Sequence, residues 1–259
     1  MISFDFLVLT KNNIDELSET LSSIPSSNNF LAINVIVFDG SNAELDRSFF
    51  LPFFKDRLIA WKYYWIPEVR GIYPSMNFAL NQVSSDWFLF LNSGDSFHPS
   101  FDINLHRDLF EANSSIVFGQ AEIVSDNYQV KWLVPDSKVT SISNWLAFFE
   151  PNHQAMFVRS CLSKSFMFDT SSPVGADATW KRQLLDNYEY IFLKAPIISF
   201  RLGGVSSSYS WRVISIKLKE PSRNLPQKLM EIFKYILFKL RIFLPILQKF
   251  KSSLIGRIF

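Results

Sequence analysis

Three short apolar runs, each followed at once by polar residues, constrain the fold of the first hundred residues more than any other sequence feature. The runs cover residues 4–10, 35–38 and 87–91, and their β-branched and aromatic residues are typical of strands buried on both faces. Segments with helical spacing lie between them. Because strands and helices alternate, we expect an α/β fold with a Rossmann-like sheet, mixed but mainly parallel and flanked by helices.

The helices can be placed from their caps and their periodicity. Asn13 followed by Glu16 forms a capping box that predicts a helix start. Met76 and Leu80 mark the apolar face of a second helix over residues 73–83. The other predicted elements are strands over residues 58–64, 115–124, 130–134 and 154–158 and helices over residues 144–149 and 176–185.

The polar residues that follow the strands predict a binding site. Thr10, Asp39 and the segment 92–95 each come directly after a predicted strand. In open parallel sheets, ligands bind beyond the carboxyl ends of the strands. We therefore expect these three segments to meet at one edge of the sheet and to form the site there.

Charge and cysteine content exclude some classes of protein. The net charge is only +2, whereas a dedicated nucleic-acid-binding protein carries a strong basic excess. The single cysteine, Cys161, allows neither an intrachain disulfide nor a thiolate metal cluster. The N-terminus resembles a buried strand and not a signal peptide. We therefore expect a cytoplasmic protein that does not bind nucleic acid.

Two aspartates at the predicted edge carry alternative interpretations. Asp39 can accept hydrogen bonds from a base or a ribose, or it can cap a helix that begins near Asn42. Asp95 stands beside Asn92 and Gly94, where a phosphate-bound Mg²⁺ or Mn²⁺ would find the oxygen ligands it prefers. The alternative is that residues 92–95 form an ordinary turn.

Residues 68–95 resemble a known family. They read E-V-R-G-I-Y-P-S-M-N-F-A-L-N-Q-V-S-S-D-W-F-L-F-L-N-S-G-D, which is similar to the segment D-K-G-I-Y-D-A-M-N-K-G…L-N-S-G-D of family 2 glycosyltransferases with the GT-A fold. The most similar branch that we identify includes bacterial colanic-acid, exopolysaccharide and O-antigen transferases. Further pieces of the pattern occur before and after this segment, in the family's order, and the resemblance covers roughly residues 2–208. They are residues 39–41, 153–157, 168–169, 175–177 and 200–206.

The resemblance implies a role for each matching position. Asp177 stands where the family keeps its general base, and Asp95 and Asn92 stand in the place of the metal-binding motif. His153 is similar to a family histidine that contacts metal, phosphate or acceptor; the alternative is a core histidine bonded to backbone. The nucleotide-sugar donor would meet the remaining matching positions, which are Thr10, Asp39, Arg70 and Asn77.

The sequence also departs from the family pattern. Val69 replaces the usual acid before the Lys-Gly-Ile-Tyr segment, and Pro74 replaces the acid after it. Residues 42–44 read Asn-Ala-Glu where the family has Thr-Asp. These departures bear on metal dependence and on the identity of the donor, but not on the fold.

The C-terminal segment differs in character from the rest of the chain. From residue 226 onward it holds seven Lys or Arg against one Glu, with apolar residues at helical spacing. Three cations near a bilayer centre cost about 8–10 kcal/mol together, and a dozen apolar residues recover only about 4–7 kcal/mol. We therefore expect residues 221–259 to form an amphipathic helical tail on an anionic membrane surface, after a catalytic domain of residues 1–220. The alternative is a helix packed on this chain's own core or on a second copy.

Together these observations predict an inverting glycosyltransferase of the hexosyltransferase type. It would move a sugar from a nucleotide-diphosphate donor, with Mg²⁺ or Mn²⁺, to a glycan or lipid-linked acceptor in bacterial surface polysaccharide synthesis, on the cytoplasmic face of the inner membrane. Two alternatives stay open. A nucleotidyltransferase would need a glycine-rich loop after its first strand, and residues 10–13 hold no glycine. A non-catalytic assembly partner is the other, motivated by Val69 and Pro74.

Overall fold

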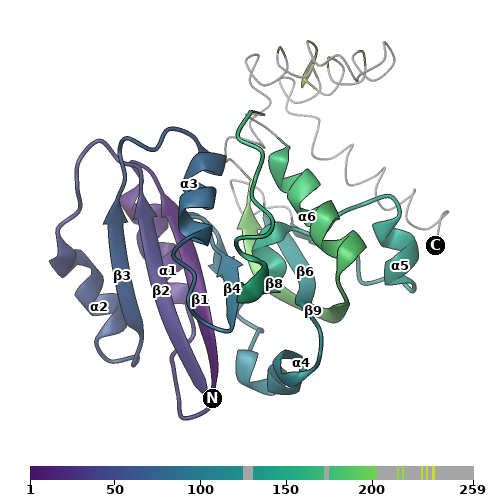
Figure 1. Ribbon diagram of the computed structural model, residues 1–259, viewed down its shortest axis with the longest axis horizontal. Coiled ribbons are helices and arrows are strands. Elements are labelled where there is room, and N and C mark those ends of the chain that lie inside the picture. The colour runs from purple at the N-terminus through teal and green to yellow at the C-terminus, as the bar shows by residue number, and fades with distance from the viewer. Residues whose placement is uncertain are drawn as a thin grey trace. The chain divides into compact units, whose positions relative to one another are not determined.

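Four parallel strands form one half of the sheet in the computed structural model, which describes residues 1–124, 131–171 and 175–202 and six single residues beyond them. Their order across the sheet is β3-β2-β1-β4, and the arrowheads of β2 and β3 point to the same end in Figure 1. The predicted parallel strands are thus confirmed. Their bounds are β1 (Ile2–Thr10), β2 (Leu31–Asp39), β3 (Ala60–Trp65) and β4 (Trp87–Phe90).

Mixed pairing continues the same sheet on the other side of β4. The order there is β8-β6-β9-β5, with β7 also paired to β6, and only β6 and β9 run parallel to each other. Strand β9 and the short strand β5 were not predicted. The bounds are β5 (Ser96–Phe97), β6 (Ile116–Val124), β7 (Lys131–Val134), β8 (Met156–Arg159) and β9 (Tyr190–Arg201).

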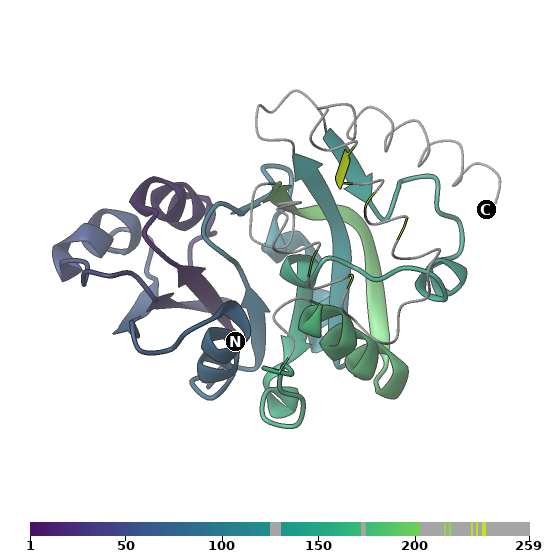
Figure 2. The same cartoon turned by 90° about the horizontal axis from the view of Figure 1, so that it is seen from above.

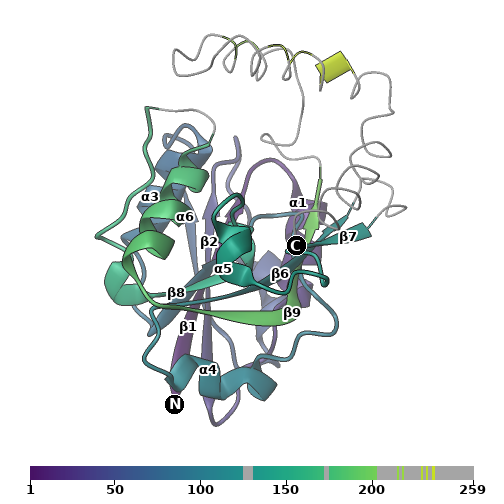
Figure 3. The same cartoon turned by 90° about the vertical axis from the view of Figure 1, so that its right-hand side faces the viewer.

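Strands β6 and β9 approach each other closely at Gly119. A Cβ atom at this position would lie 2.7 Å from the Ile197 side chain and 2.8 Å from the Ala195 carbonyl oxygen. The register of the β6–β9 pair shifts at the same place. Strands β6 and β9 form a long pair in Figure 3. Because glycine has no Cβ atom, the two strands can stay in close contact at the register shift.

The helices cover both faces of the sheet. Helix α1 (Ile14–Ser23) and helix α3 (Ile72–Leu80) lie on opposite faces, as the view from above shows (Figure 2). This arrangement follows from right-handed crossovers that run outward from β1 to β2 and back from β3 to β4. Asn13 caps α1 as predicted, because its Oδ1 accepts a hydrogen bond from the Glu16 amide at 3.2 Å.

Helices α3 and α6 (Ala176–Asn187) lie side by side on one face (Figures 1 and 3). The helix predicted over residues 144–149 begins and ends earlier, as α5 (Ile142–Leu146). The remaining helices are α2 (Leu51–Phe54), α4 (Arg107–Glu111) and the 3₁₀ segments Arg47–Phe50, Ile103–His106, His153–Ala155 and Ser160–Leu162.

Aromatic side chains fill the layers on both faces of the sheet, and many of the chain's 27 phenylalanines are buried there. On one face the ring of Phe4 meets that of Phe110 at 4.9 Å, and Phe157 lies 4.9 Å from Phe110. On the other face Phe168 stacks on Trp180 at 4.8 Å. Because offset and edge-on ring pairs add about 0.5–1.5 kcal/mol beyond burial, these contacts hold the helices on the sheet.

A buried carboxylate closes the amino-terminal end of the sheet. Asp5 is fully buried and accepts four hydrogen bonds, from the amides of Ser84 and Ser85, from the Ser85 hydroxyl and from the Asn34 side chain. A strand rises about 3.3 Å per residue, so Asp5 lies roughly 16 Å from Thr10 along β1. Asp5 therefore stabilises the fold and takes no part in the predicted site.

The chain divides into two compact units, residues 1–137 with 143–201 and residues 138–142 with 202–259. The strands and helices given above belong to the first unit, apart from the first residue of α5. In the predicted tail over residues 221–259 only Leu229, Ile232, Tyr235 and Ile236 are described; these four are helical, and Leu229 and Ile236 are exposed. The predicted boundary at residue 220 lies outside the described residues. Among those that are described, no helix combines the length and apolar character that crossing a membrane requires.

Candidate active site

The three predicted polar segments meet at the carboxyl edge of the parallel strands. Thr10 and Asp39 are register partners at the ends of β1 and β2, and both are buried. The Ser93 amide, just after β4, donates to the Leu9 carbonyl at 2.8 Å. The sheet order therefore places the ends of β2, β1 and β4 next to one another, as the sequence predicted.

Asp39 is held by a turn and by a neighbouring strand. Its Oδ1 accepts from the Ser41 amide at 2.8 Å, and its Oδ2 accepts from the Tyr63 hydroxyl of β3 at 2.9 Å. Burial, together with the Asp39 charge, raises the pKa of Tyr63, so that hydroxyl stays a donor. The alternative in which Asp39 caps a helix near Asn42 is wrong, because the next helical segment begins at Arg47 and is capped by Asp46.

The segment after β4 is tied to three other parts of the fold through Asp95. One oxygen of its carboxylate, Oδ1, accepts from the backbone amide of Arg201 at the end of β9, and Oδ2 accepts from the Gln154 side chain, both at 3.0 Å. Its carbonyl accepts from the Thr20 hydroxyl of α1 at 2.7 Å. Burial, with a smaller effect of the nearby Glu16 carboxylate, raises the pKa of Asp95 well above its ordinary value.

This geometry does not fit a divalent metal site. Each carboxylate oxygen of Asp95 accepts one N–H hydrogen bond and keeps a lone pair, but Mg²⁺ needs several oxygen ligands in near-octahedral geometry. Within the described part of the chain, no three His, Cys, Asp or Glu side chains are grouped so that they could hold a metal ion. Asp95 joins separate segments here, and the metal role predicted for it stays a prediction. The Asp95 amide does donate to the Asn92 carbonyl at 3.0 Å, as in a turn.

Asp177 stands on the first turn of α6, with polar groups on several sides. Gly175, at φ 90°, precedes the helix in a left-handed conformation. The Tyr73 hydroxyl of α3 donates to Asp177 Oδ1 at 3.0 Å. On the other oxygen, Oδ2, the Lys181 Nζ lies at 3.4 Å and the His153 Nδ1 at 3.8 Å. The predicted base and the predicted histidine are thus neighbours.

The electrostatics of this cluster favour an ionised carboxylate. Burial alone would raise the pKa of Asp177, but Lys181, then His153 and then the Tyr73 hydrogen bond outweigh it, so the pKa is lowered. Burial lowers the pKa of His153 to about 4, so the imidazole is neutral near pH 7. Burial and the Asp177 charge raise the pKa of Tyr73 to about 12. Asp177 is therefore a charged acceptor beside a neutral imidazole.

Several buried polar atoms near these groups have no hydrogen-bond partner among the described residues. They are Oδ1 of Asn92, Oγ of Ser93, Nε2 of His153 and Oε1 of Gln154. Most buried polar atoms in folded proteins are paired, so an unpaired group of this kind indicates water or a ligand. Neither ring nitrogen of His153 bonds to the backbone of a described residue, and the alternative of a backbone-bonded core histidine is wrong.

Two further predicted residues lie on or before α3. The Asn77 amide donates to the Phe168 carbonyl at 2.9 Å and accepts from the Phe168 amide at 2.7 Å. The Phe168 ring stacks on Tyr73, so Asn77 supports the wall behind Asp177. Arg70 is exposed and forms no hydrogen bond or ion pair with the residues that the structure describes. Donor contacts for Asn77 and Arg70 stay predictions.

Sequence reasoning missed several members of the site. Lys181 follows Asp177 by four residues, and this spacing, which makes neighbours on a helix, could have found it. Gln154 follows His153 directly but carried no motif of its own. Tyr73 lay within the quoted family segment without an assigned role. No sequence pattern places Glu150, whose Oε2 lies 3.8 Å from the Lys181 Nζ.

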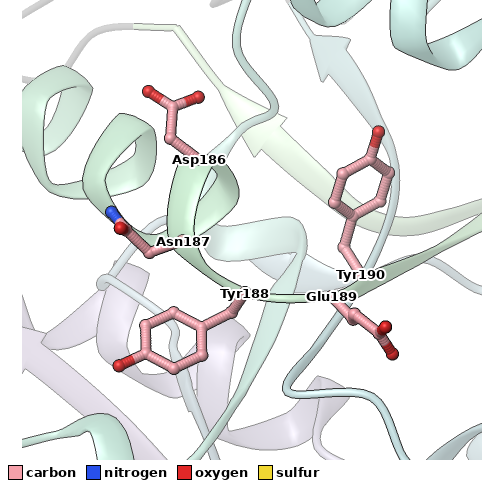
Figure 4. A pocket seen from close by; sticks show the side chains of 5 residues that line it. All are labelled: Asp186, Asn187, Tyr188, Glu189 and Tyr190. Carbon is pink, nitrogen blue, oxygen red and sulfur yellow. The ribbon is translucent and has the colours of Figure 1, made fainter.

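A shallow surface hollow lies at the opposite end of α6. It is lined by residues 186–190, about 14 Å along the helix from Asp177 at 1.5 Å per residue. The side chains of Asp186, Tyr188 and Glu189 point in different directions there (Figure 4). Because these polar groups do not converge, the hollow is separate from the site and supports no binding function.

Comparison with known proteins identifies the family. The profile described as Glycosyl transferase family 2 matches residues 5–167. The fold is similar to that of S. aureus TarS (TM-score 0.58, 16% identity), with 93% of this chain matched to 43% of that chain. The chain thus spans less than half of TarS. No curated protein matches the sequence.

Two shorter structures cover more of their own length. A form of S. aureus TarS, residues 1–349 in complex with UDP, matches with a TM-score of 0.59, 15% identity and coverage of 91% of this chain and 71% of that one. Mannosyltransferase PcManGT from Pyrobaculum calidifontis, in complex with GDP-Man and Mn²⁺, matches with a TM-score of 0.54, 14% identity and coverage of 90% and 69%. The family profile and the doubly wound mixed sheet confirm the resemblance seen in the sequence: this chain belongs to glycosyl transferase family 2 and is a glycosyltransferase with the GT-A fold.

Proposed function

We propose that the chain moves a sugar from a nucleotide-diphosphate donor to an acceptor hydroxyl in one inverting step. The observation that carries the proposal is the ionised Asp177 carboxylate beside His153, next to a carboxyl edge with unpaired buried polar atoms. A general base must be charged and within reach of the proton that it removes. Asp177 meets the first condition, and α6 presents it from the start of the helix.

The proposed reaction is a single in-line displacement. The acceptor oxygen attacks the anomeric carbon while its proton passes to the Asp177 carboxylate. The bond between the anomeric carbon and the diphosphate oxygen breaks on the opposite side, and its electron pair leaves with the nucleoside diphosphate. The anomeric configuration inverts because the attacking and leaving oxygens lie on opposite faces of the sugar. His153, neutral and beside the base, is assigned to the acceptor side.

The donor is assigned to the edge formed by β2, β1 and β4. Thr10 and Asp39 would contact the nucleoside, Asn92 the phosphates or sugar, and the exposed guanidinium of Arg70 the diphosphate charge. Two similar structures, TarS in complex with UDP and PcManGT in complex with GDP-Man and Mn²⁺, support a nucleotide-sugar donor of this class. Because the described residues around Asp95 do not form a metal site, no step of the reaction is assigned to Mg²⁺ or Mn²⁺.

A thermal-shift screen tests the donor assignment. We expect one of UDP, GDP and dTDP, with or without Mn²⁺, to raise the melting temperature of the full chain. Binding at one hundred times the dissociation constant stabilises a protein by about 2.7 kcal/mol, which corresponds to about 5–10 °C at this size. ADP serves as a control of equal charge. An identical shift with all four nucleotides, or no shift, would contradict a specific nucleotide site.

The acceptor and the place of action extend the proposal. We assign a glycan or lipid-linked acceptor in bacterial surface polysaccharide synthesis, met on the cytoplasmic face of the inner membrane by a basic tail after residue 220. The support is the excess of seven Lys or Arg over one Glu from residue 226 onward and the exposure of Leu229 and Ile236. An enzyme held at the membrane surface would diffuse in the same plane as a lipid-linked acceptor and would meet it more often.

Vesicle sedimentation tests the tail. The full chain is expected to bind vesicles that contain anionic phosphatidylglycerol and to bind pure phosphatidylcholine weakly. Replacing both Lys234 and Arg241 with glutamine removes about 2 kcal/mol of attraction, so the partition coefficient should fall about thirtyfold. The matched control replaces Lys55 and Lys164, two exposed lysines of the catalytic unit. Equal binding to both kinds of vesicle would show that the tail serves another purpose.

A further inference from the structure

Lys181 on α6 is unusually buried for a lysine. It lies one turn after Asp177 on α6, yet its side chain is only 9% exposed. Its ammonium lies 3.4 Å from Asp177 Oδ2 and 3.8 Å from Glu150 Oε2. A buried charge is costly unless it is paired, whereas a solvated i,i+4 pair contributes little. The burial of Lys181 therefore couples it closely to both carboxylates.

Glu150 is held from its other side. Its Oε1 lies 3.3 Å from Nη2 of Arg182, and Nη1 of the same guanidinium donates to the Leu146 carbonyl at 2.9 Å. The charges thus alternate in a row that starts at Arg182, passes through Glu150 and Lys181 and ends on Oδ2 of Asp177. Because Tyr73 holds Oδ1, both oxygens of the Asp177 carboxylate have a fixed neighbour.

Lys181 is the cation of this cluster. Tyr73 faces Asp177 from α3, His153 faces it from the 3₁₀ segment His153–Ala155, and Glu150 approaches through Lys181 from the segment after α5. Tyr73 is a neutral donor, His153 is neutral near pH 7, and Glu150 is the second carboxyl group beside Lys181. Among the described residues, Lys181 therefore makes the largest contribution to lowering the pKa of Asp177, ahead of His153, which contributes when its imidazole is protonated.

We propose that Lys181 is a positioning residue that fixes the Asp177 carboxylate and keeps it ionised, and that Glu150 is a second carboxylate that shares the Lys181 charge. The inference rests on the proposed function of Asp177 as the base. Lys181 touches neither substrate nor the reacting atoms in this scheme; it acts through the carboxylate. The i,i+4 spacing on α6 places Lys181 beside Asp177, whereas only the fold brings Glu150 to Lys181.

The pH dependence of sugar transfer tests the proposal. A base works only when deprotonated, so kcat/KM falls as the pH drops through the pKa of Asp177. Lys181→Met removes the cation that lowers this pKa, so the acid limb should move upward by about one pH unit. Because the pKa of Asp177 lies below its ordinary value, the loss should appear on the acid side of neutrality, and activity near pH 9 should stay close to that of the wild type. Lys181→Arg keeps the charge and should keep the limb closer to that of the wild type. Lys164→Met, at an exposed lysine, is the control and should leave the profile unchanged.

Other outcomes have distinct meanings. An equal loss of activity by Lys181→Met at every pH would indicate a merely structural role and overturn the inference, and so would an unchanged profile. If Lys181→Met does not fold, Glu150→Gln takes its place. In that variant Asp177 is the remaining carboxylate partner of Lys181, so the acid limb should move to lower pH. An unchanged limb, or a limb that moves to higher pH, would contradict the proposal. If Asp177→Asn is active, the proposed function itself fails.

Discussion

Replacing Asp177 with asparagine is expected to lower the rate of sugar transfer by about a hundred- to ten-thousandfold, the usual contribution of a general base. The amide has nearly the same shape, and its oxygen can still accept the Tyr73 hydrogen bond seen at 3.0 Å. It cannot take the acceptor proton at neutral pH. Because the donor is assigned to the strand edge and not to α6, the dissociation constant for the nucleotide should change little.

Steady-state transfer and calorimetric nucleotide binding measure the two effects separately. Asp169→Asn is the matched control: Asp169 is exposed and accepts hydrogen bonds only from Ser171 among the described residues, so it should leave both quantities unchanged. Normal turnover by Asp177→Asn would remove Asp177 from the role of base. A wild-type chain that neither transfers nor hydrolyses any donor would favour the assembly-partner alternative.

Asp95→Asn is expected to destabilise the fold and to abolish most of the activity. Both partners of the carboxylate, the Arg201 amide and the Gln154 side-chain amide, are donors, so an asparagine must turn its own NH₂ toward one of them. A buried donor left unpaired costs about 1–3 kcal/mol, and more beside a charged group, and the melting temperature should fall by about 2–4 °C for each kcal/mol. Activity should fall because Gln154 adjoins His153.

Melting curves with and without Mn²⁺ separate this structural role from metal ligation. Under the structural role, Asp95→Asn melts lower than the wild type even without added metal. If Asp95 instead binds the metal, Mn²⁺ would raise the melting temperature of the wild type. The variant would then lack this rise but would melt like the wild type without added metal. Asp86→Asn is the control, because Asp86 also accepts two hydrogen bonds, both from Ser3, but is exposed. It should cost less than about 1 kcal/mol.

The parallel half of the fold could be predicted because each of its elements is coded locally. The runs that became β1, β2 and β4 are almost wholly apolar, and Asn13 marks the start of α1 by a side-chain cap that forms as expected. Strand β9 could not be predicted in the same way. Lys194 and Pro196 interrupt its apolar run, and it pairs with β6 across a register shift that only tertiary contact fixes.

The site was predictable to the extent that strand ends and helix starts determine it. The ends of β1, β2 and β4 meet because parallel strands share an edge, and Asp177 lies in the first turn of α6 as expected. What the carboxylates do could not be read from residue types. Asp95 resembles a ligand in the sequence, but its partners are an amide 106 positions later and a side chain 59 positions later. Asp39 and Asp5 are equally buried, yet they lie at opposite ends of the sheet.

The hydrogen bond from the Arg201 amide to Asp95 also bears on how the protein is made. Residues at the end of β4 leave the ribosome long before β9 does, and loop closure over such a separation is slow compared with local structure. Until the last strand docks, the loop after β4 lacks one of its anchors. A nascent chain can therefore form the four parallel strands early, yet the loop after β4 gains its Arg201 anchor only once β9 has left the ribosome.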